Sequence, residues 1–316
     1  MGANRLWTYS ENKCYANCRR EHQLRYVRGY SPAASRSSLA FGTAIHAGLE
    51  AWWKAPKTTR LASSVSAAVA YAEEHGFDEF EICKLRALLL GYDTRWSNQS
   101  YETIAVEAEF RAPLTPFVDL GGKIDVIARD GARKVGIEHK TSSLDIGPGS
   151  DYWRTLRIDG QATVYFVGAD ALGHDLDEMV YDMIGKPKLK PYKATPVKDR
   201  KYTKKTGELY ANQRAEDETP AEYFVRLCDD IGARPDDYYQ RIPIVRLERE
   251  VDETMREMVA NATSLAPALR NTSACRRYGS TCEFLPVCTG EASLDDERLF
   301  TIRENTHPEL SAEVQS

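Results

Sequence analysis

Residues 121–141 read GGKIDVIARDGARKVGIEHKT, and this stretch predicts two strands joined by a tight turn. The first strand, residues 124–128, is apolar apart from a single aspartate. The Asp-Gly pair at 130–131 supplies the chemistry of a hairpin turn, and residues 134–140 return as the second strand. We therefore expect a β-hairpin on which the rest of the chain is organised.

The hairpin carries three ionisable side chains, Asp125, Glu138 and Lys140. An acid buried in an apolar strand is costly unless it has a partner or a metal ion. Residues two apart in a strand point to the same face, so Glu138 and Lys140 share a face, and the hairpin can bring Asp125 beside them. Two carboxylates suit a divalent cation, and a lysine can orient water or stabilise developing negative charge. The alternative is a charged surface hairpin with one ion pair.

Two further polar features lie outside the hairpin. His46 falls within residues 39–55, LAFGTAIHAGLEAWWKA, whose apolar spacing predicts an amphipathic helix. Gln161 and Tyr165 are four apart in a predicted helix at residues 151–172, so their side chains face the same way. Taken singly, the histidine is equally consistent with a core or surface residue, and the pair with a polar helix surface.

The hairpin residues resemble the motif of the PD-(D/E)xK nucleases. Asp125 matches the first acid, and Glu138-His139-Lys140 matches the E-x-K triplet. The resemblance implies that Asp125 and Glu138 hold Mg²⁺ or Mn²⁺, with the backbone carbonyl of His139 as a further ligand. It also implies that Lys140 positions or activates the attacking water.

The features outside the hairpin resemble motifs of the RecB-like branch of that family. The Gly-x-x-x-His stretch that ends at His46 resembles the histidine motif, whose histidine is a metal ligand. Gln161-x-x-x-Tyr165 resembles a motif that lies on a helix over the active site and contacts the DNA strand. Glu107 resembles a glutamate that supports the metal site, although a solvent-facing glutamate is the alternative. The resemblance covers roughly residues 5–185, with the pieces in family order.

Composition and charge narrow the class of protein. The chain has 316 residues and a net charge of −5, which is ordinary for a soluble globular protein. No global basic field exists, so DNA binding must come from a local patch. No apolar run approaches the length of a membrane span and the N-terminal residues contain no apolar signal core, so we expect a cytoplasmic protein without a membrane partner.

Three cysteines lie close together near the C-terminus. Cys275, Cys282 and Cys288 are separated by six and five residues, and such clustering in a cytosolic chain suggests a metal or cluster. With Cys18 they make four thiolates, enough for a [4Fe–4S] cluster or a zinc ion. The layout resembles RecB-like nucleases with an iron–sulfur staple, although the first gap is wider than in that family. Cys14 is an alternative to Cys18, and both are also consistent with buried apolar cysteines.

A strongly basic segment follows the predicted nuclease core. Residues 186–205 contain nine Lys or Arg residues, one acid and three prolines. A solvated, mobile loop is one interpretation. Tyr192 and Tyr202 also fit an arm that binds phosphates electrostatically and stacks bases. Both interpretations hold for a loop that becomes ordered only on DNA.

These features together predict an α/β fold of the restriction-endonuclease-like kind, with a mixed central sheet flanked by helices and an N-terminal helical cap. We expect residues 1–290 to form a single RecB-like nuclease domain. It would contain a helical insertion at about 50–100, a basic loop at about 186–218 and the cysteine cluster at 275–288. A flexible acidic tail would follow at 291–316.

The resemblance implies a Mg²⁺- or Mn²⁺-dependent deoxyribonuclease. We expect an exonuclease that acts on DNA ends or single strands in recombination, repair or phage DNA processing. The sequence contains no phosphate-binding loop of the helicase type, so a helicase or recombination protein would be a separate partner. The alternative is a non-catalytic DNA-binding or assembly subunit on the same fold. A zinc hydrolase would need a His-rich ligand set, and the chain has six histidines and no H-E-x-x-H motif.

Overall fold

The structure is a computed structural model that describes residues 4–33, 37–277, 280–308 and 310–311. Its strands are β1 (Arg5–Thr8), β2 (Tyr30–Pro32), β3 (Glu102–Thr115), β4 (Val118–Asp130), β5 (Arg133–Ser142), β6 (Glu178–Gly185), β7 (Tyr239–Ile244), β8 (Arg276–Arg277), β9 (Ser280–Thr281) and β10 (Phe300–Ile302). Its α-helices are α1 (Tyr9–Asn17), α2 (Arg19–His22), α3 (Ser37–Lys54), α4 (Arg60–Glu74), α5 (Glu79–Trp96), α6 (Asp151–Arg157), α7 (Gly160–Ala171), α8 (Pro220–Ala233), α9 (Pro235–Tyr238), α10 (Glu248–Ala262) and α11 (Leu285–Thr289). A π-helix, η1 (Gln23–Val27), and two 3-10 turns, η2 (Val197–Asp199) and η3 (Thr272–Ala274), complete the described elements.

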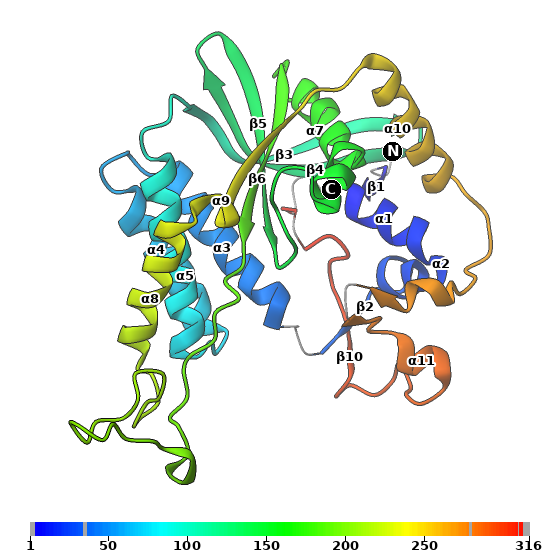
Figure 1. The fold of residues 1–316 in the computed structure, drawn as a ribbon. Helices are drawn as coiled ribbons and strands as arrows, with labels where there is room; N and C mark the ends of the chain where they lie inside the picture. Colours follow the sequence, from blue (N-terminus) through cyan, green and yellow to red (C-terminus); the bar gives the residue numbers. More distant parts are fainter. Residues whose placement is uncertain (1–3, 34–36, 278–279, 309, 312–316) are drawn as a thin grey trace.

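A mixed sheet forms the centre of the molecule (Figure 1). Its order is β1-β4-β5-β6-β7, with β3 paired along the other side of β4. The pairs β1–β4 and β5–β6 are parallel, and the remaining pairs are antiparallel. The predicted hairpin is confirmed as β4 and β5, and Gly131 takes a positive φ of 62° in the turn between them. The predicted mixed α/β class is therefore correct.

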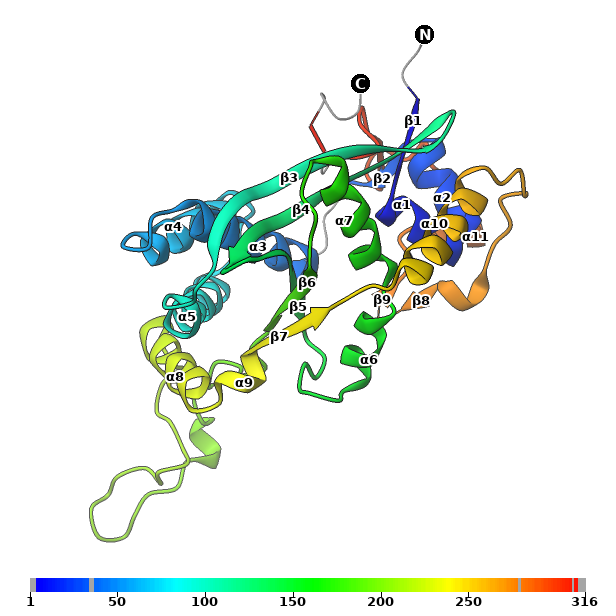
Figure 2. The same cartoon turned by 90° about the horizontal axis from the view of Figure 1, so that it is seen from above.

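Helices cover both faces of the sheet, as Figures 1 and 2 show. On one face α3, α4, α5 and α8 enclose a core that includes Trp52, Tyr92 and Leu227, against Val126 of β4 and Ile137 of β5. On the other face α7, α1 and α10 pack over Ile124, Ile127 and further buried residues. No helix in the described ranges is long and apolar enough to cross a membrane.

Two helical stretches are broken where the backbone leaves the helical region. Near the N-terminus, α1 ends at Asn17 and α2 begins at Arg19, because Cys18 is extended at φ −156° and ψ 107°. The helix expected at 151–172 divides into α6 and α7, and Asp159 caps the second piece by accepting from the Gln161 backbone N–H at 2.8 Å. This cap fixes where α7 begins and therefore where Gln161 lies.

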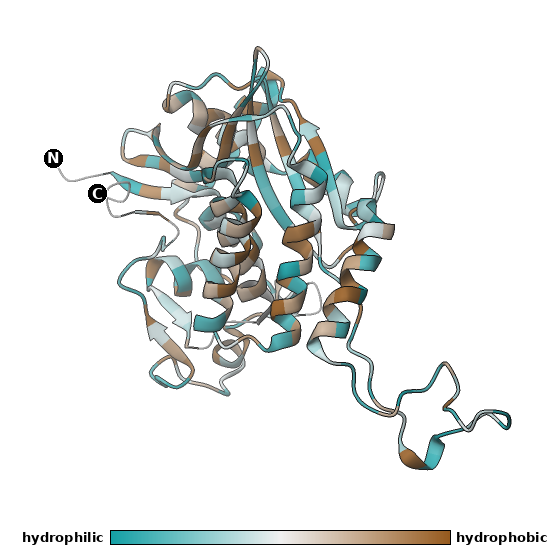
Figure 3. Ribbon diagram, turned by 90° about the vertical axis from the view of Figure 1, so that its left-hand side faces the viewer, coloured by the Kyte–Doolittle hydropathy of each residue, from teal (hydrophilic) through white to brown (hydrophobic). Residues whose placement is uncertain are grey.

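Two segments lie outside the two-faced core. Residues 186–218 run away from the body of the molecule beyond α8, and Figure 3 shows them as a largely hydrophilic projection. At the C-terminal end, where the sequence suggests a flexible tail, β10 pairs antiparallel with β2 and the side chains of Phe300 and His307 are buried. These contacts are long-range in sequence, so local composition gives no sign of them.

Candidate active site

The candidate site lies where β4 and β5 separate. Their pairing runs from the turn as far as Val126 opposite Ile137, and beyond that point β4 pairs with β1 instead. Asp125 is the first residue past the last β4–β5 pair. Its carboxylate Oδ2 accepts a hydrogen bond from the His139 backbone N–H at 2.8 Å. The hairpin therefore brings Asp125 beside the E-x-K strand, as the sequence predicts.

Glu138 and Lys140 share the face of β5 that α7 covers, and Gln161 joins them. The Lys140 ammonium donates to Glu138 Oε1 and to Gln161 Oε1, each at 2.6 Å. The Gln161 amide nitrogen donates to Glu138 Oε1 and to the Tyr165 hydroxyl, each at 2.8 Å. The predicted i, i+4 pair on α7 is thus one network with the E-x-K residues. Tyr165 is buried and lies behind Gln161.

His46 approaches the site from α3, on the other side of Asp125. Its Nδ1 lies 3.7 Å from Asp125 Oδ2. Burial lowers the pKa of His46 to about 3, and the nearby Lys140 and Lys123 ammonium groups act in the same direction. The imidazole is therefore neutral at physiological pH, which is the form that binds metal ions. Gly42 lets α3 approach, since a Cβ there would lie 3.1 Å from Thr141 Oγ1.

The two carboxylates are held in a way that is unfavourable without a cation. Burial and the negative charges of Glu138 and Glu107 raise the pKa of Asp125 well above its usual range. The second carboxylate oxygen of Glu138 is buried and has no hydrogen-bond partner among the described residues. Burial opposes the charged form of Lys140, but the adjacent Glu138 carboxylate outweighs it and raises the lysine pKa. Oxygen ligands of this kind, with a neutral imidazole nearby, fit a hard divalent cation.

Within the part of the chain that the structure describes, no three His, Cys, Asp or Glu side chains are already grouped so as to hold a metal ion. The Lys140 ammonium forms an ion pair with Glu138 Oε1. The ligand that the sequence suggests at His139 is a backbone carbonyl and not a side chain. The potential ligand atoms therefore suit a divalent cation, but in the present arrangement Glu138 binds the Lys140 ammonium.

The His139 side chain lies outside the site. It points to the opposite face of β5 and is buried, with Nδ1 3.4 Å from Asp182 Oδ2. Arg241 pairs with the same Asp182 carboxylate at 3.0 Å. Burial disfavours the charged form of Asp182, but Arg241 outweighs it and lowers the pKa of that carboxyl. His139 therefore contacts Asp125 through its backbone N–H, and the metal-ligand role of its carbonyl stays a prediction.

Glu107 faces Asp125 from the neighbouring strand β3. The flanking residues Val106 and Ala108 pair with Val126 and Ile124 of β4. Glu107 has a positive φ of 54°, which is unusual for a residue with a Cβ and costs energy that the surrounding structure must repay.

The Glu107 carboxylate forms an ion pair with Lys123, two residues before Asp125. Sequence reasoning missed Lys123, although its spacing of two from Asp125 was a usable signal. A cavity of about 580 Å³ opens over these groups and also reaches His46 and Lys186.

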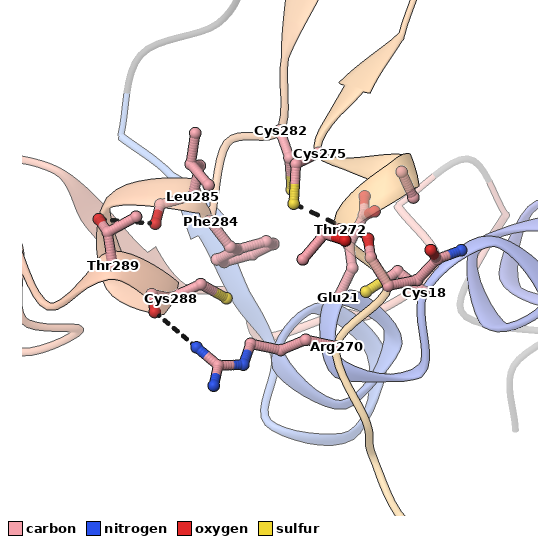
Figure 4. A pocket seen from close by; sticks show the side chains of 12 residues that line it. Cys18, Glu21, Arg270, Thr272, Cys275, Cys282, Phe284, Leu285, Cys288 and Thr289 are labelled. Carbon is pink, nitrogen blue, oxygen red and sulfur yellow. Dashed lines mark hydrogen bonds between the residues drawn. The ribbon is translucent and has the colours of Figure 1, made fainter.

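The four predicted cysteines come together at a separate place (Figure 4). Cys18 at the α1–α2 break and Cys275, Cys282 and Cys288 of the C-terminal segment line one cavity of about 120 Å³. All are free thiols, and burial raises the pKa of Cys282 and of Cys288. Cys14 is buried but does not line this cavity. Of the two N-terminal cysteines, Cys18 therefore lines the cavity, although the thiols are not already grouped so as to hold a metal ion among the described residues.

The mixed sheet flanked by helices is consistent with the restriction-endonuclease-like class of folds. The model of the PD-(D/E)XK nuclease superfamily matches residues 6–289, and the chain belongs to this superfamily. A solved structure titled "Crystal structure of SSO0001" is 14% identical, with a TM-score of 0.27, over 75% of this chain and 80% of that chain. No curated protein matches the sequence.

Proposed function

We propose that the protein hydrolyses phosphodiester bonds of DNA with Mg²⁺ or Mn²⁺ at the opening between β4 and β5. The observation that carries this proposal is the convergence of Asp125, Glu138 and Lys140, together with a buried carboxylate oxygen of Glu138 that has no hydrogen-bond partner among the described residues. Residues of this kind in a nuclease superfamily favour hydrolysis over a purely structural ion pair.

Asp125 and Glu138, the imidazole of His46 and the backbone carbonyl of His139 would hold the metal ion. When bound, such an ion polarises the phosphate and lowers the pKa of a water ligand. The protein's contribution is to fix the acids, to keep His46 neutral, and to place a positive charge beside them. Glu107, paired with Lys123 across from Asp125, supports this arrangement without being placed as a ligand.

Lys140 acts as a cation in this proposal. Its raised pKa keeps the ammonium protonated, so it orients the attacking water and stabilises negative charge on the phosphate oxygens. Gln161 holds the ammonium in place through its amide oxygen and presents its side chain to the substrate strand. Tyr165 fixes the Gln161 amide and contributes to strand binding through it.

We further propose exonuclease action on ends or single strands, in recombination, repair or phage DNA processing, with a helicase or recombination protein as a separate partner. The test is degradation of end-labelled linear single-stranded, linear double-stranded and closed circular DNA in Mg²⁺ or Mn²⁺. Loss of linear DNA with circles spared supports an exonuclease, and the labels give its polarity. Cleavage of circles would replace it with an endonuclease of the same chemistry. Tight DNA binding without cleavage in either metal would favour the non-catalytic subunit.

The cysteine cavity would hold a [4Fe–4S] cluster, with zinc as the alternative. Four thiols line it, and Arg20 and Arg270 are placed to favour the thiolate form of Cys288 against the effect of burial. A metal centre here would tie α1 and α2 to the C-terminal segment, so its role would be structural.

A further inference from the structure

The segment between β6 and α8 is built as an arm. We call residues 188–218 the basic arm; it projects beyond α8 with little contact to the body (Figures 1 and 3). Of its described side chains only that of Glu218 is buried, so no apolar core holds it together. A connection this long without a core is usually either functional or disordered.

Hydrogen bonds between the outgoing and returning limbs give the arm a defined shape. Tyr202 and Leu209 form an antiparallel bridge, and the Thr203 N–H donates to the Glu208 carbonyl at 2.8 Å. Nearer the base, the Arg200 guanidinium donates to backbone carbonyls on both limbs at 2.9 and 2.7 Å. The tip is therefore an ordered hairpin rather than a chain without structure.

The charge on the arm is divided between base and tip. Residues 186–205 carry nine basic side chains and one acid, whereas residues 206–218 of the returning limb carry one arginine and four acids. Near the base, Asp217 pairs with Lys193 at 2.9 Å and Glu218 pairs with Arg226 at 2.7 Å. No carboxylate among the described residues pairs with the lysines of the outer part, which are Lys198, Lys201, Lys204 and Lys205. These ammonium groups are free to bind an anionic partner.

Two aromatic rings lie exposed beside these lysines. The side chains of Tyr202 and Tyr210, on opposite limbs of the tip, are 55% and 44% exposed. Tyr192 differs, because the Arg226 guanidinium stacks on its ring at 3.9 Å. Unpaired ammonium groups bind phosphates, and exposed rings stack on bases that are not already stacked in a duplex. The combination fits a single DNA strand better than a duplex or an acidic protein surface.

Lys186 connects the arm to the catalytic cleft. It lines the same cavity as His46 and Asp125, and it also lines a second cavity of about 500 Å³ at the base of the arm. Lys188 and Arg234 line that second cavity as well. Basic groups thus continue from the site, past Lys186, to the start of the arm.

We propose that the basic arm is a single-strand-binding element that holds the DNA strand leading into or out of the catalytic cleft. Tyr202 and Tyr210 stack on its bases, and the lysines of the tip neutralise its phosphates. The proposal deepens the proposed function and rests on it for the identity of the substrate. Binding itself does not require cleavage, so the two can be tested separately.

The test is fluorescence anisotropy of a fluorescein-labelled oligothymidylate, titrated with the full-length protein while divalent metal is withheld. Lys204→Ala/Lys205→Ala should weaken binding and reduce the magnitude of the slope of log K against log salt by about 1.4, because two phosphate contacts are lost. Lys57→Ala/Lys84→Ala removes the same charge elsewhere and should leave both unchanged.

The stacking role is tested with Tyr202. Tyr202→Ala should weaken binding about tenfold, whereas Tyr202→Phe keeps the ring and should bind like wild type. Equal binding by wild type and both arm variants would overturn the proposal, as would an equal loss in the Lys57/Lys84 control. A wild-type protein that binds the strand through the arm but cleaves no DNA in Mn²⁺ would leave the arm proposal standing and refute the proposed nuclease activity.

Discussion

Gln161 accepts a hydrogen bond from Lys140 through its amide oxygen and donates one to Glu138 through its amide nitrogen. The Gln161 amide thereby contacts both Lys140 and Glu138, the proposed catalytic cation and metal ligand. Removing it would leave Lys140 held only by Glu138. The residue is therefore expected to matter for the rate of the chemical step and not only for binding.

Gln161→Ala is expected to lower kcat about a hundredfold, because Lys140 and Glu138 would no longer be held in the orientation that the reaction needs. Tyr165→Phe removes only the hydroxyl that accepts from Gln161 and should cost about tenfold or less. Steady-state kinetics on linear DNA would measure both. An effect of Gln161→Ala confined to KM would show that the side chain serves only to bind the strand.

Asp125 shows how a charged group of the site lowers the stability of the folded, metal-free protein. Its folded-state pKa lies above the ordinary value, so ionisation at neutral pH destabilises the metal-free protein. Asp125→Asn should therefore stabilise the metal-free protein at neutral pH. The gain should vanish as the pH falls below the usual aspartate pKa of 3.8, where the carboxyl is neutral in both states.

Asp119, on the same strand, provides a control of opposite sign. Burial is unfavourable to its charge, but hydrogen bonds from Asn4 and Arg111 outweigh it and lower its pKa. Asp119→Asn should therefore lower the stability at neutral pH. Thermal melts in the presence of a chelator compare the two variants, and a drop in the melting temperature of Asp125→Asn would contradict the electrostatic account of the site.

At the scale of elements, local patterns predicted what depends on neighbours in the sequence. The turn between β4 and β5 fixes the register that places Asp125 beside His139, and the spacing of four on α7 aligns Gln161 with Tyr165. The site opens because β4 leaves β5 and pairs with β1 instead. Strand β1 is more than a hundred residues away in the sequence. No local pattern carries that information.

Contacts between residues far apart in the sequence also explain two features that the sequence did not predict. These features are the break at Cys18 and the pairing of β10 with β2, and both lie where the N-terminal and C-terminal segments meet. Lys186 reaches the site because β6 lies beside β5, which is a parallel pairing set by tertiary contacts. Charges and spacings in the sequence identify candidates, but only the packing decides which of them meet.

Cys18, at the break between α1 and α2, lines one cavity with three C-terminal cysteines, and this arrangement gives a prediction about metal binding. Cys282→Ser should lose bound iron or zinc and lower the melting temperature, because one of four thiols that line the cavity is removed. Cys14→Ser, on the same N-terminal segment but outside the cavity, should keep its metal. Elemental analysis and visible absorption of protein purified without oxygen measure the content and distinguish iron–sulfur from zinc. Metal-free wild type, or equal loss in both variants, would refute the assignment.

At the scale of the whole molecule, a buried charged cluster joins the two ends of the chain. Glu11 accepts from His22 Nε2 at 2.8 Å and pairs with Arg5 at 2.6 Å, and its other oxygen lies 3.2 Å from His307 Nε2. Burial disfavours the charge on Glu11, but His22, His307 and Arg5 outweigh it and lower its pKa. This cluster holds the C-terminal segment against α1.

The sign of the resulting pH dependence follows from that lowered pKa. Glu11 contributes stability above its usual value of 4.5, and that contribution is lost as the pH falls through the lower folded-state pKa. Acid should therefore lower the melting temperature, and Glu11→Gln should flatten the curve while starting from a less stable protein at neutral pH. Identical slopes for the two proteins below the usual glutamate pKa would show that the cluster does not govern acid unfolding.

The central claim is that Lys140 and the two acids at the β4–β5 opening form a hydrolytic site. Its most direct test is single-turnover cleavage of linear DNA in Mn²⁺ by wild type, by Lys140→Ala, and by Lys134→Ala as a control on the same strand that makes no ion pair with Glu138. We predict cleavage by wild type and Lys134→Ala and a loss of about a thousandfold in Lys140→Ala. Comparable rates for wild type and Lys140→Ala would contradict the account.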